Sequence, residues 1–256
     1  MAITFAVRGD SLTPRFNGAG GPGYGLAGQT TTVESDGTAI GGSVLDMDLG
    51  ALNNMQVVYN GVDNWPATRA CSVLIRAKFG TLTGAIGLFN CSAATRSCNG
   101  QLSLYINSSD FKAYMRNAGG SLGINNATIS THGMSTATWH DIVVTYTGTN
   151  SSNGFTVYVD GSSVGSLTSS TSWDATRKKV HSGLEIGRGG DNVNNTQMLV
   201  NEFVLWDEVI TPTSVGLTSG TGSLNGSSRT AFVDVAAKDG SASGGPSLIS
   251  LGSIGF

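Results

Sequence analysis

The chain has 256 residues, of which 39% are hydrophobic, and this length is sufficient for one core of sizeable volume. Only 12% of the residues are charged and the net charge is −3, so there is no basic surface for a phosphate backbone, and nucleic acid is excluded as a partner. The 37 glycines follow no three-residue period, which excludes collagen and indicates many tight turns.

Short strand patterns follow one another along the chain, and no long helical pattern interrupts them. Turn-forming pairs such as Asp36-Gly37, Asn60-Gly61 and Asn225-Gly226 separate them. This spacing predicts an all-β fold, an antiparallel two-sheet jelly-roll sandwich. We expect strands at residues 3–7, 31–33, 43–48, 56–59, 72–79, 85–89, 102–106, 111–116, 139–146, 155–159, 163–167, 184–186, 201–207 and 232–236.

The most informative segment runs from Trp139 to Gly161. Its second strand, FTVYV, alternates apolar and polar residues, as a half-buried strand does. The pair Asp160-Gly161 follows directly and suits a type I′ hairpin turn that leads into SSVGSL.

The two ends differ in composition from the middle. We expect a single domain over residues 1–256, with a jelly-roll core over about 31–215 and Gly/Ser-rich extensions at 9–30 and 216–256. The last residues, PSLISLGSIGF, carry five large apolar side chains that are unsuited to free solvent. The tail is therefore either a docking segment for neighbouring subunits or a final strand of the sheet.

No targeting segment is recognised at the N-terminus. MAITFAVRGD lacks a basic leader region, and no stretch reaches the roughly 18 consecutive apolar residues of a membrane span. We therefore expect synthesis in a cytosol and no membrane partner.

Three cysteines are too few for a secreted disulfide framework. Cys91 and Cys98 flank the loop SAATRS, so a disulfide that staples a hairpin and a pair of reduced thiols both remain open. The histidines His132, His140 and His181 show no zinc-ligand spacing with the cysteines.

Two short charged motifs are interpreted as loops. Arg8-Gly9-Asp10 matches the integrin-binding tripeptide, but it ends an expected strand and is typical of an ordinary turn. Arg177-Lys178-Lys179 is the only basic cluster and is expected to be a solvated loop.

Four segments together carry a family resemblance. WHDIVVTY, FTVYVDGSSVGS, LEIGR from Leu184 and NEFVLWDEVITP from Asn201 resemble, in order and spacing, the concanavalin A-like lectin/glucanase superfamily and its laminin G and pentraxin-like jelly rolls. The resemblance covers roughly residues 70 to 215. Within them, alternate residues such as Phe155 and Val157 are expected to form the core.

The resemblance implies sugar binding, often through calcium held by oxygen ligands. The nearest candidate for a Ca²⁺ site is the loop GRGGDNVNNTQ, whose oxygen donors are Asp191, Asn192, Asn194 and Asn195. Since only one of the four is a carboxylate, the site would be weak, and a solvated turn is the preferred interpretation. Aromatic rings that would stack on sugars are Tyr24, Trp65 and Trp173.

The resemblance does not extend to catalysis. Glucanases of this superfamily carry an E-x-D-x-x-E strand whose carboxylates attack and protonate the sugar, and this chain has no such spacing. Glu185 and Glu202 remain a pair that would meet if their strands were adjacent. With no G-x-S-x-G motif either, we expect a protein that is not an enzyme and uses no cofactor.

Two functions follow from this combination. The first is a virion surface protein, a capsid decoration or cement protein of a tailed bacteriophage, which self-associates and binds neighbouring capsid or tail proteins. The alternative is a lectin-like module of a tail fibre or adhesin that recognises host glycans.

Overall fold

The computed structural model describes residues 3–10, 16–17, 25–26, 31–47, 57–60, 70–90, 102–116, 122–148, 153–169, 183–189, 197–206 and 208–212. Within these ranges the chain is all-β apart from a single short 3-10 helix, so the predicted fold class is confirmed. The elements are β1 (Ile3–Arg8), β2 (Phe16–Asn17), β3 (Gly25–Leu26), β4 (Thr32–Ser35), η1 (Ile40–Gly42), β5 (Ser43–Asp46), β6 (Val57–Asn60), β7 (Cys71–Phe79), β8 (Ala85–Asn90), β9 (Leu102–Asn107), β10 (Asp110–Arg116), β11 (Leu122–Ile129), β12 (Trp139–Tyr146), β13 (Phe155–Val159), β14 (Ser162–Leu167), β15 (Gly183–Ile186) and β16 (Met198–Trp206).

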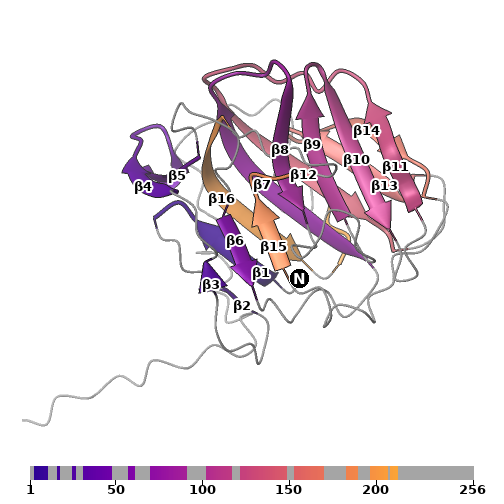
Figure 1. Cartoon of the computed structure of the whole chain (residues 1–256), viewed down its shortest axis with the longest axis horizontal. Coiled ribbons are helices and arrows are strands. Elements are labelled where there is room, and N and C mark those ends of the chain that lie inside the picture. The colour runs from indigo at the N-terminus through magenta and orange to yellow at the C-terminus, as the bar shows by residue number, and fades with distance from the viewer. Residues whose placement is uncertain are drawn as a thin grey trace, which may run out of the picture.

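The described strands form two antiparallel sheets that lie face to face (Figure 1). The nine-stranded sheet has the order β14-β13-β12-β7-β16-β1-β2, with β5 pairing with β16 and β4 with β5. The seven-stranded sheet has the order β11-β10-β9-β8-β15-β6-β3. Neighbours that are distant in sequence, such as β7 and β16, show the crossovers of a jelly roll.

The main core lies between the two sheets. In β13, Phe155, Val157 and Val159 are buried in this core, while the residues between them are partly exposed, as the alternation of the sequence predicts. Phe89 of β8 and Phe203 of β16 join the sheets by an edge-to-face ring contact, with ring centroids 6.2 Å apart. The core therefore depends on side chains from both layers.

The outer face of the nine-stranded sheet is buried as well. All eight residues of β12 are buried, and Ile40 and Ile210 pack against the apolar residues of this face. Strands buried on both faces read as continuous apolar runs rather than as alternating patterns. The pairing register aligns one apolar row across five strands: Tyr158, Val143, Leu74, Val204 and Ala6.

A second row on this outer face is charged. The register places Asp141, Arg76, Glu202 and Arg8 side by side on β12, β7, β16 and β1, with alternating sign. Arg76 Nη1 lies 3.0 Å from Asp141 Oδ2, and neither side chain has any exposed surface. The guanidinium carbon of Arg76 also lies 5.5 Å from the ring centroid of Trp139, within cation–π range. We call these four residues the charged row.

A bulge in β16 fastens the segment 36–43 to the sheet. The register shifts between Val200 and Glu202, so Asn201 is the extra residue. Its Nδ2 donates to the carbonyl oxygens of Ile40 and Ser43 at 3.0 and 2.9 Å, and its Oδ1 accepts from the Ile40 amide. Three hydrogen bonds from one buried side chain therefore hold this segment.

Asp36 adds an ionic contact to the same segment, because its carboxylate pairs with Lys78 on β7. Burial raises the pKa of Asp36, but hydrogen bonds from Lys78 and from Thr38, together with the positive charge of Lys78, lower it more. The pKa of Asp36 therefore lies below its ordinary value of 3.8.

The predicted Asp160-Gly161 turn is confirmed. Val159 pairs with Ser162, which leaves a two-residue loop, and Asp160 and Gly161 both have positive φ, at 49° and 83°. A type I′ turn requires positive φ at both central positions, which is why Asp-Gly is favoured there.

The sequence prediction missed three strands. β11 carries the polar run Asn125-Asn126 and shifts register twice against β10, so it lacks a clean alternation. β2 and β3 lie within the Gly-rich segment 9–30, where β2 pairs with β1 and β3 with β6. These two short segments are therefore strands because their main chain pairs with a neighbouring strand, and their Gly-rich composition does not predict this.

Several predicted features lie outside the described residues. They are the strand at 232–236, the apolar tail, the basic cluster at 177–179 and the pair Cys91 and Cys98. The remaining cysteine, Cys71, is buried in the main core.

The Arg8-Gly9-Asp10 motif lies at the end of β1, where Gly9 and Asp10 form a turn. The Gly9 amide donates to the carbonyl of Asn201 at 2.7 Å, and a Cβ on Gly9 would meet the Ser43 carbonyl oxygen at 2.5 Å. Glycine is required here by the close approach of the two backbones, which supports the interpretation of the motif as a turn.

Candidate functional site

Four connections between strands form a polar surface at one end of the sandwich. We define the polar rim as residues 80–84, 107–110, 130–138 and 160–162, which contain GTLTG, NSSD, STHGMSTAT and DGS. Ser, Thr, Gly, Asn and Asp make up most of it. Loops held by a rigid β scaffold are where binding residues concentrate.

Direct hydrogen bonds join three of these connections. The Ser108 amide donates to the Gly84 carbonyl at 2.7 Å, and the His132 amide donates to the Ser109 carbonyl at 2.8 Å. The Thr131 amide donates to Asp110 Oδ1 at 3.3 Å. The segments 80–84, 107–110 and 130–138 therefore form one continuous surface.

His132 is a buried support beneath the rim. Its Nδ1 accepts from the Met134 amide at 2.9 Å, so the proton lies on Nε2, which donates to the Ser108 carbonyl at 2.8 Å. The ring also packs against Phe111, with centroids 5.7 Å apart. His132 thus fixes two rim segments relative to each other.

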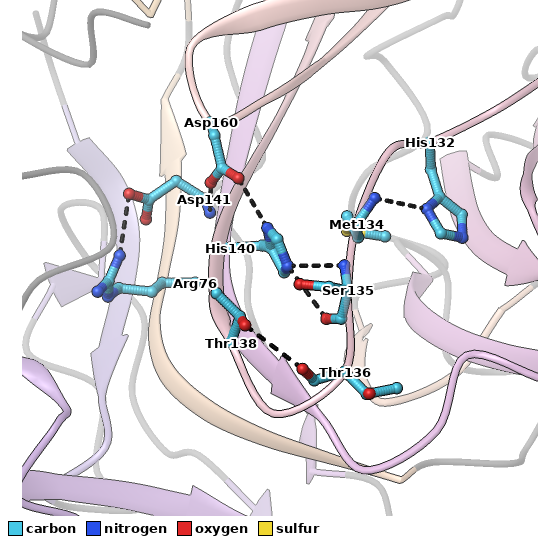
Figure 2. Close-up of polar contacts among 9 residues, drawn as sticks. All are labelled: Arg76, His132, Met134, Ser135, Thr136, Thr138, His140, Asp141 and Asp160. Atoms are coloured by element: carbon cyan, nitrogen blue, oxygen red, sulfur yellow. Dashed lines mark hydrogen bonds and ion pairs between the residues drawn. The ribbon is translucent and has the colours of Figure 1, made fainter. Parts of the chain in front are cut away.

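His140 supports the other half of the rim, as Figure 2 shows. Its Nδ1 lies 2.7 Å from Asp160 Oδ2, and its Nε2 lies 3.1 Å from both the amide and the carbonyl of Ser135. Asp160 Oδ1 in turn accepts from the Asp141 amide at 3.0 Å. This network ties the connection 130–138 to the β13–β14 turn.

Asp160, His140 and Ser135 are the residue types of a hydrolytic triad, but their geometry is different. The His140 Nε2 is engaged by the backbone of Ser135 rather than by its hydroxyl. A nucleophile requires its hydroxyl proton to face the base. His140 is also 4% exposed. The arrangement therefore positions the loop and does not activate a serine.

The rim backbone has positive φ at four residues other than glycine. Ser108, Thr131, Ala137 and Asp160 have φ of 57°, 64°, 59° and 49°. This left-handed conformation is costly for a side chain with a Cβ, and most costly for a β-branched residue such as Thr131. Strain of this kind is retained where the surrounding contacts determine the conformation, often at ligand-binding loops.

The rim exposes hydrogen-bonding side chains on this held backbone. The side chains of Asn107, Ser108, Thr131, Ser135 and Thr136 are exposed and make no hydrogen bond to other described residues. Each hydroxyl offers one donor and two acceptor positions, and the amide offers both kinds of group. Such a surface matches a ligand that is itself rich in hydroxyl groups.

The residues proposed from sequence for ligand binding lie outside the described part of the chain. These are Asp191, Asn192, Asn194 and Asn195 for calcium, and Tyr24, Trp65 and Trp173 for sugar stacking. Among the described residues, no three His, Cys, Asp or Glu side chains are grouped to hold a metal ion. In the same ranges, no helix has the length and apolar character needed to span a membrane.

The strands of Glu185 and Glu202 are not adjacent, so the condition for these two carboxylates to meet is not fulfilled. Glu185 lies on β15 in the seven-stranded sheet, and Glu202 lies on β16 in the nine-stranded sheet. The carboxylate of Glu185 is instead engaged by Asn90 Nδ2 at 2.9 Å and by the guanidinium of Arg188.

The rim carries no distinctive sequence signal. Its main features are the density of Ser and Thr in STHGMSTAT and the run NSSD, and neither differs in composition from an ordinary loop. Only the order of the strands shows that these loops meet.

The sequence profile of the concanavalin A-like lectin/glucanases superfamily matches residues 53–216. The chain belongs to this superfamily. The match contains β6 to β16 and the rim supports described above, His132, His140 and Asp160. No curated protein matches the chain by sequence.

Solved structures with a similar fold include botulinum neurotoxin binding domains. The serotype D binding domain has a TM-score of 0.56 at 12% identity, covering 84% of this chain and 51% of that chain. The type G receptor binding domain has a TM-score of 0.56 at 11% identity, with coverages of 84% and 50%. A serotype D ligand binding domain in complex with N-acetylneuraminic acid has a TM-score of 0.56 at 10% identity, again with 84% and 50%. This superfamily member thus spans about half the length of those domains, and the likeness shows the fold.

Proposed function

We propose that this chain is a lectin-like, carbohydrate-binding module that meets its ligand at the polar rim. The observation that carries the proposal is the exposed set of hydroxyl and amide side chains on a strained backbone, held from below by His132 and His140. A preorganised surface loses little conformational entropy when it binds. Sugars offer the matching donors and acceptors.

The comparisons support a binding role of this type. The similar solved structures are named as binding domains, and one of them holds N-acetylneuraminic acid. The superfamily itself includes lectins. Function on a shared fold still depends on the particular site, so the rim has to be tested directly.

A glycan array with the full chain tests the proposal. We expect saturable binding to a limited set of oligosaccharides, and we expect Ser108→Ala and Thr136→Ala each to weaken it about three- to tenfold. Thr168→Ala is the matched control, because Thr168 is exposed beyond the other end of β14. If no glycan on the array binds, the proposal is overturned. If Thr168→Ala loses as much glycan affinity as the rim variants, the binding site does not lie at the rim.

We further propose that binding occurs without catalysis. The support is the engaged Nε2 of His140 and the separation of Glu185 and Glu202 into different sheets. Incubating each bound glycan with the protein and analysing the products by mass spectrometry should return the intact glycan. A cleaved product would contradict this.

Calcium dependence remains a prediction for the loop with Asp191, Asn192, Asn194 and Asn195. Repeating the array with a chelator tests it, because a site in which calcium links the protein to the sugar would lose its glycan binding when the ion is removed. Unchanged binding would show that the recognised sugar needs no metal ion.

The virion role stays the second proposal, and the composition of the two ends favours it. The described pieces of the segment 9–30 already pair with strands of both sheets, so Gly-rich chain can be ordered by main-chain bonds in this protein. Under this proposal, a capsid decoration protein of a tailed bacteriophage would be made in the host cytoplasm and would use its tail on neighbouring capsid subunits. Cosedimentation of the full chain and of a chain ending at residue 215 with tailed-phage particles tests it, with loss of association expected for the shorter chain.

A further inference from the structure

The charges of the polar rim are all of one sign. Its four segments contain Asp110 and Asp160 and not a single Lys or Arg. Its only histidine, His132, is buried, with both ring nitrogens already engaged by Met134 and Ser108. Nothing within these segments therefore offers a positive charge to a ligand.

The lysines on the strands that lead into the rim are engaged elsewhere. Lys78, near the end of β7, pairs with Asp36, and Lys112, near the start of β10, donates to Thr128 Oγ1. Recognition of a carboxylate usually relies on Arg or Lys, which supply charge-assisted hydrogen bonds. An anionic sugar would find no such group in the four segments of the rim.

The two rim carboxylates are held in place in different ways. Asp160 uses both oxygens on His140 and on the Asp141 amide, so it belongs to the support of the loop. Asp110 is partly exposed, and the Thr131 amide and the Ser109 hydroxyl both contact its Oδ1. Asp110 Oδ2 is therefore the carboxylate oxygen that remains available at the rim surface.

We propose that Asp110 makes the rim selective for neutral glycans and repels sialylated ones. A carboxylate brought beside Asp110 meets a like charge without compensation, which opposes binding, whereas a neutral hydroxyl can donate to Asp110 Oδ2. This inference rests on the proposed carbohydrate-binding function. It predicts a ligand of a different charge class from the N-acetylneuraminic acid held by the similar toxin domain.

An array that presents neutral oligosaccharides beside their sialylated forms tests the selectivity. For the wild-type chain we expect each sialylated form to bind at least about tenfold more weakly than its neutral partner. Asp110→Asn should narrow this ratio, because the amide keeps an oxygen for the Thr131 amide and removes the charge. High salt should narrow it as well, since screening weakens repulsion between exposed charges.

Glu34→Gln is the matched control, because it removes one negative charge on the exposed strand β4 and should leave the ratio unchanged. Thermal unfolding of Asp110→Asn confirms that the variant is folded. Equal or tighter binding of sialylated forms by the wild-type chain would overturn the selectivity while leaving the glycan-binding function in place. An unchanged ratio in Asp110→Asn would overturn the role of Asp110, and silence on every glycan would remove the function on which both rest.

Discussion

The charged row and the polar rim are both polar, yet they differ in burial and in backbone conformation. Arg76 and Asp141 in the row are fully buried on regular strands and neutralise each other. Ser108 and Thr131 in the rim are exposed, on a backbone with positive φ. Polar side chains buried within a sheet thus stabilise the fold, while polar side chains exposed on well-held loops are available to a ligand.

The two regions are also mechanically linked. His140 and Asp141 are consecutive on β12, so one strand contributes to the rim with the first residue and to the charged row with the second. Successive side chains of a strand point to opposite faces, and here the neighbouring residues serve different regions. Because the row is buried and the rim is exposed, substitutions in the row should mainly change the stability of the fold, and substitutions in the rim should mainly change ligand binding.

The largest expected effect comes from breaking the charged row. Arg76→Met leaves Asp141 buried without its cation and should lower the free energy of unfolding by about 3 to 5 kcal/mol. Urea denaturation followed by circular dichroism measures it. Lys112→Met, which removes a partly exposed lysine, should cost less than about 1 kcal/mol.

A double variant sharpens this test. Arg76→Met combined with Asp141→Asn removes the unpaired charge, so it should be more stable than Arg76→Met alone. If the double variant were the less stable one, the buried carboxylate would not be the cause of the loss.

A smaller effect is expected outside the charged row, where Asp36 pairs with Lys78 on β7. The pKa of Asp36 is lower in the folded chain than its ordinary 3.8, so its contribution is present above that pH and is lost as the pH falls through the lower, folded value. Asp36→Asn should therefore be less stable than the wild type at neutral pH, by about 1 kcal/mol. This difference should vanish in acid.

Chemical denaturation of both proteins between pH 7 and pH 2 measures the difference. Glu34→Gln serves as the control for net charge, and its free energy of unfolding should stay within about 0.5 kcal/mol of the wild type at pH 7. If the difference in the free energy of unfolding between Asp36→Asn and the wild type grew toward acid pH, the lowered pKa of Asp36 in the folded chain would be contradicted.

The smallest effect, of opposite sign, is expected in the rim. Thr131→Gly relieves the strain of φ at 64° and should stabilise the chain by about 0.5 kcal/mol, after the entropy that glycine adds to the unfolded chain is subtracted. Thr136→Gly, at a residue without positive φ, should destabilise it by about 0.5 to 1 kcal/mol. Differential scanning calorimetry distinguishes the two, and a loss of stability in both would show that Thr131 stores no strain.

Much of the fold was readable from sequence because its signals are local. The alternation of Phe155, Val157 and Val159 predicts β13, and Asp160-Gly161 predicts the turn after it. β11 was missed because its two buried isoleucines, Ile124 and Ile129, lie across a register shift and follow no period of two. The rim was missed because its Ser and Thr residues resemble any solvated loop.

Local sequence patterns are sufficient to predict the all-β class, the superfamily and the central hairpin, since each depends on residues that are close together in the chain. Tertiary structure alone decided the neighbours of each charge. It set Arg76 beside Asp141, which lies 65 positions further along the chain. It placed Glu185 and Glu202, which are 17 positions apart, in different sheets, and it joined Gly84, Ser108 and His132 into one rim. Strand order in a jelly roll is fixed by how two sheets bury their apolar faces together, and that long-range packing is not encoded in any single local pattern.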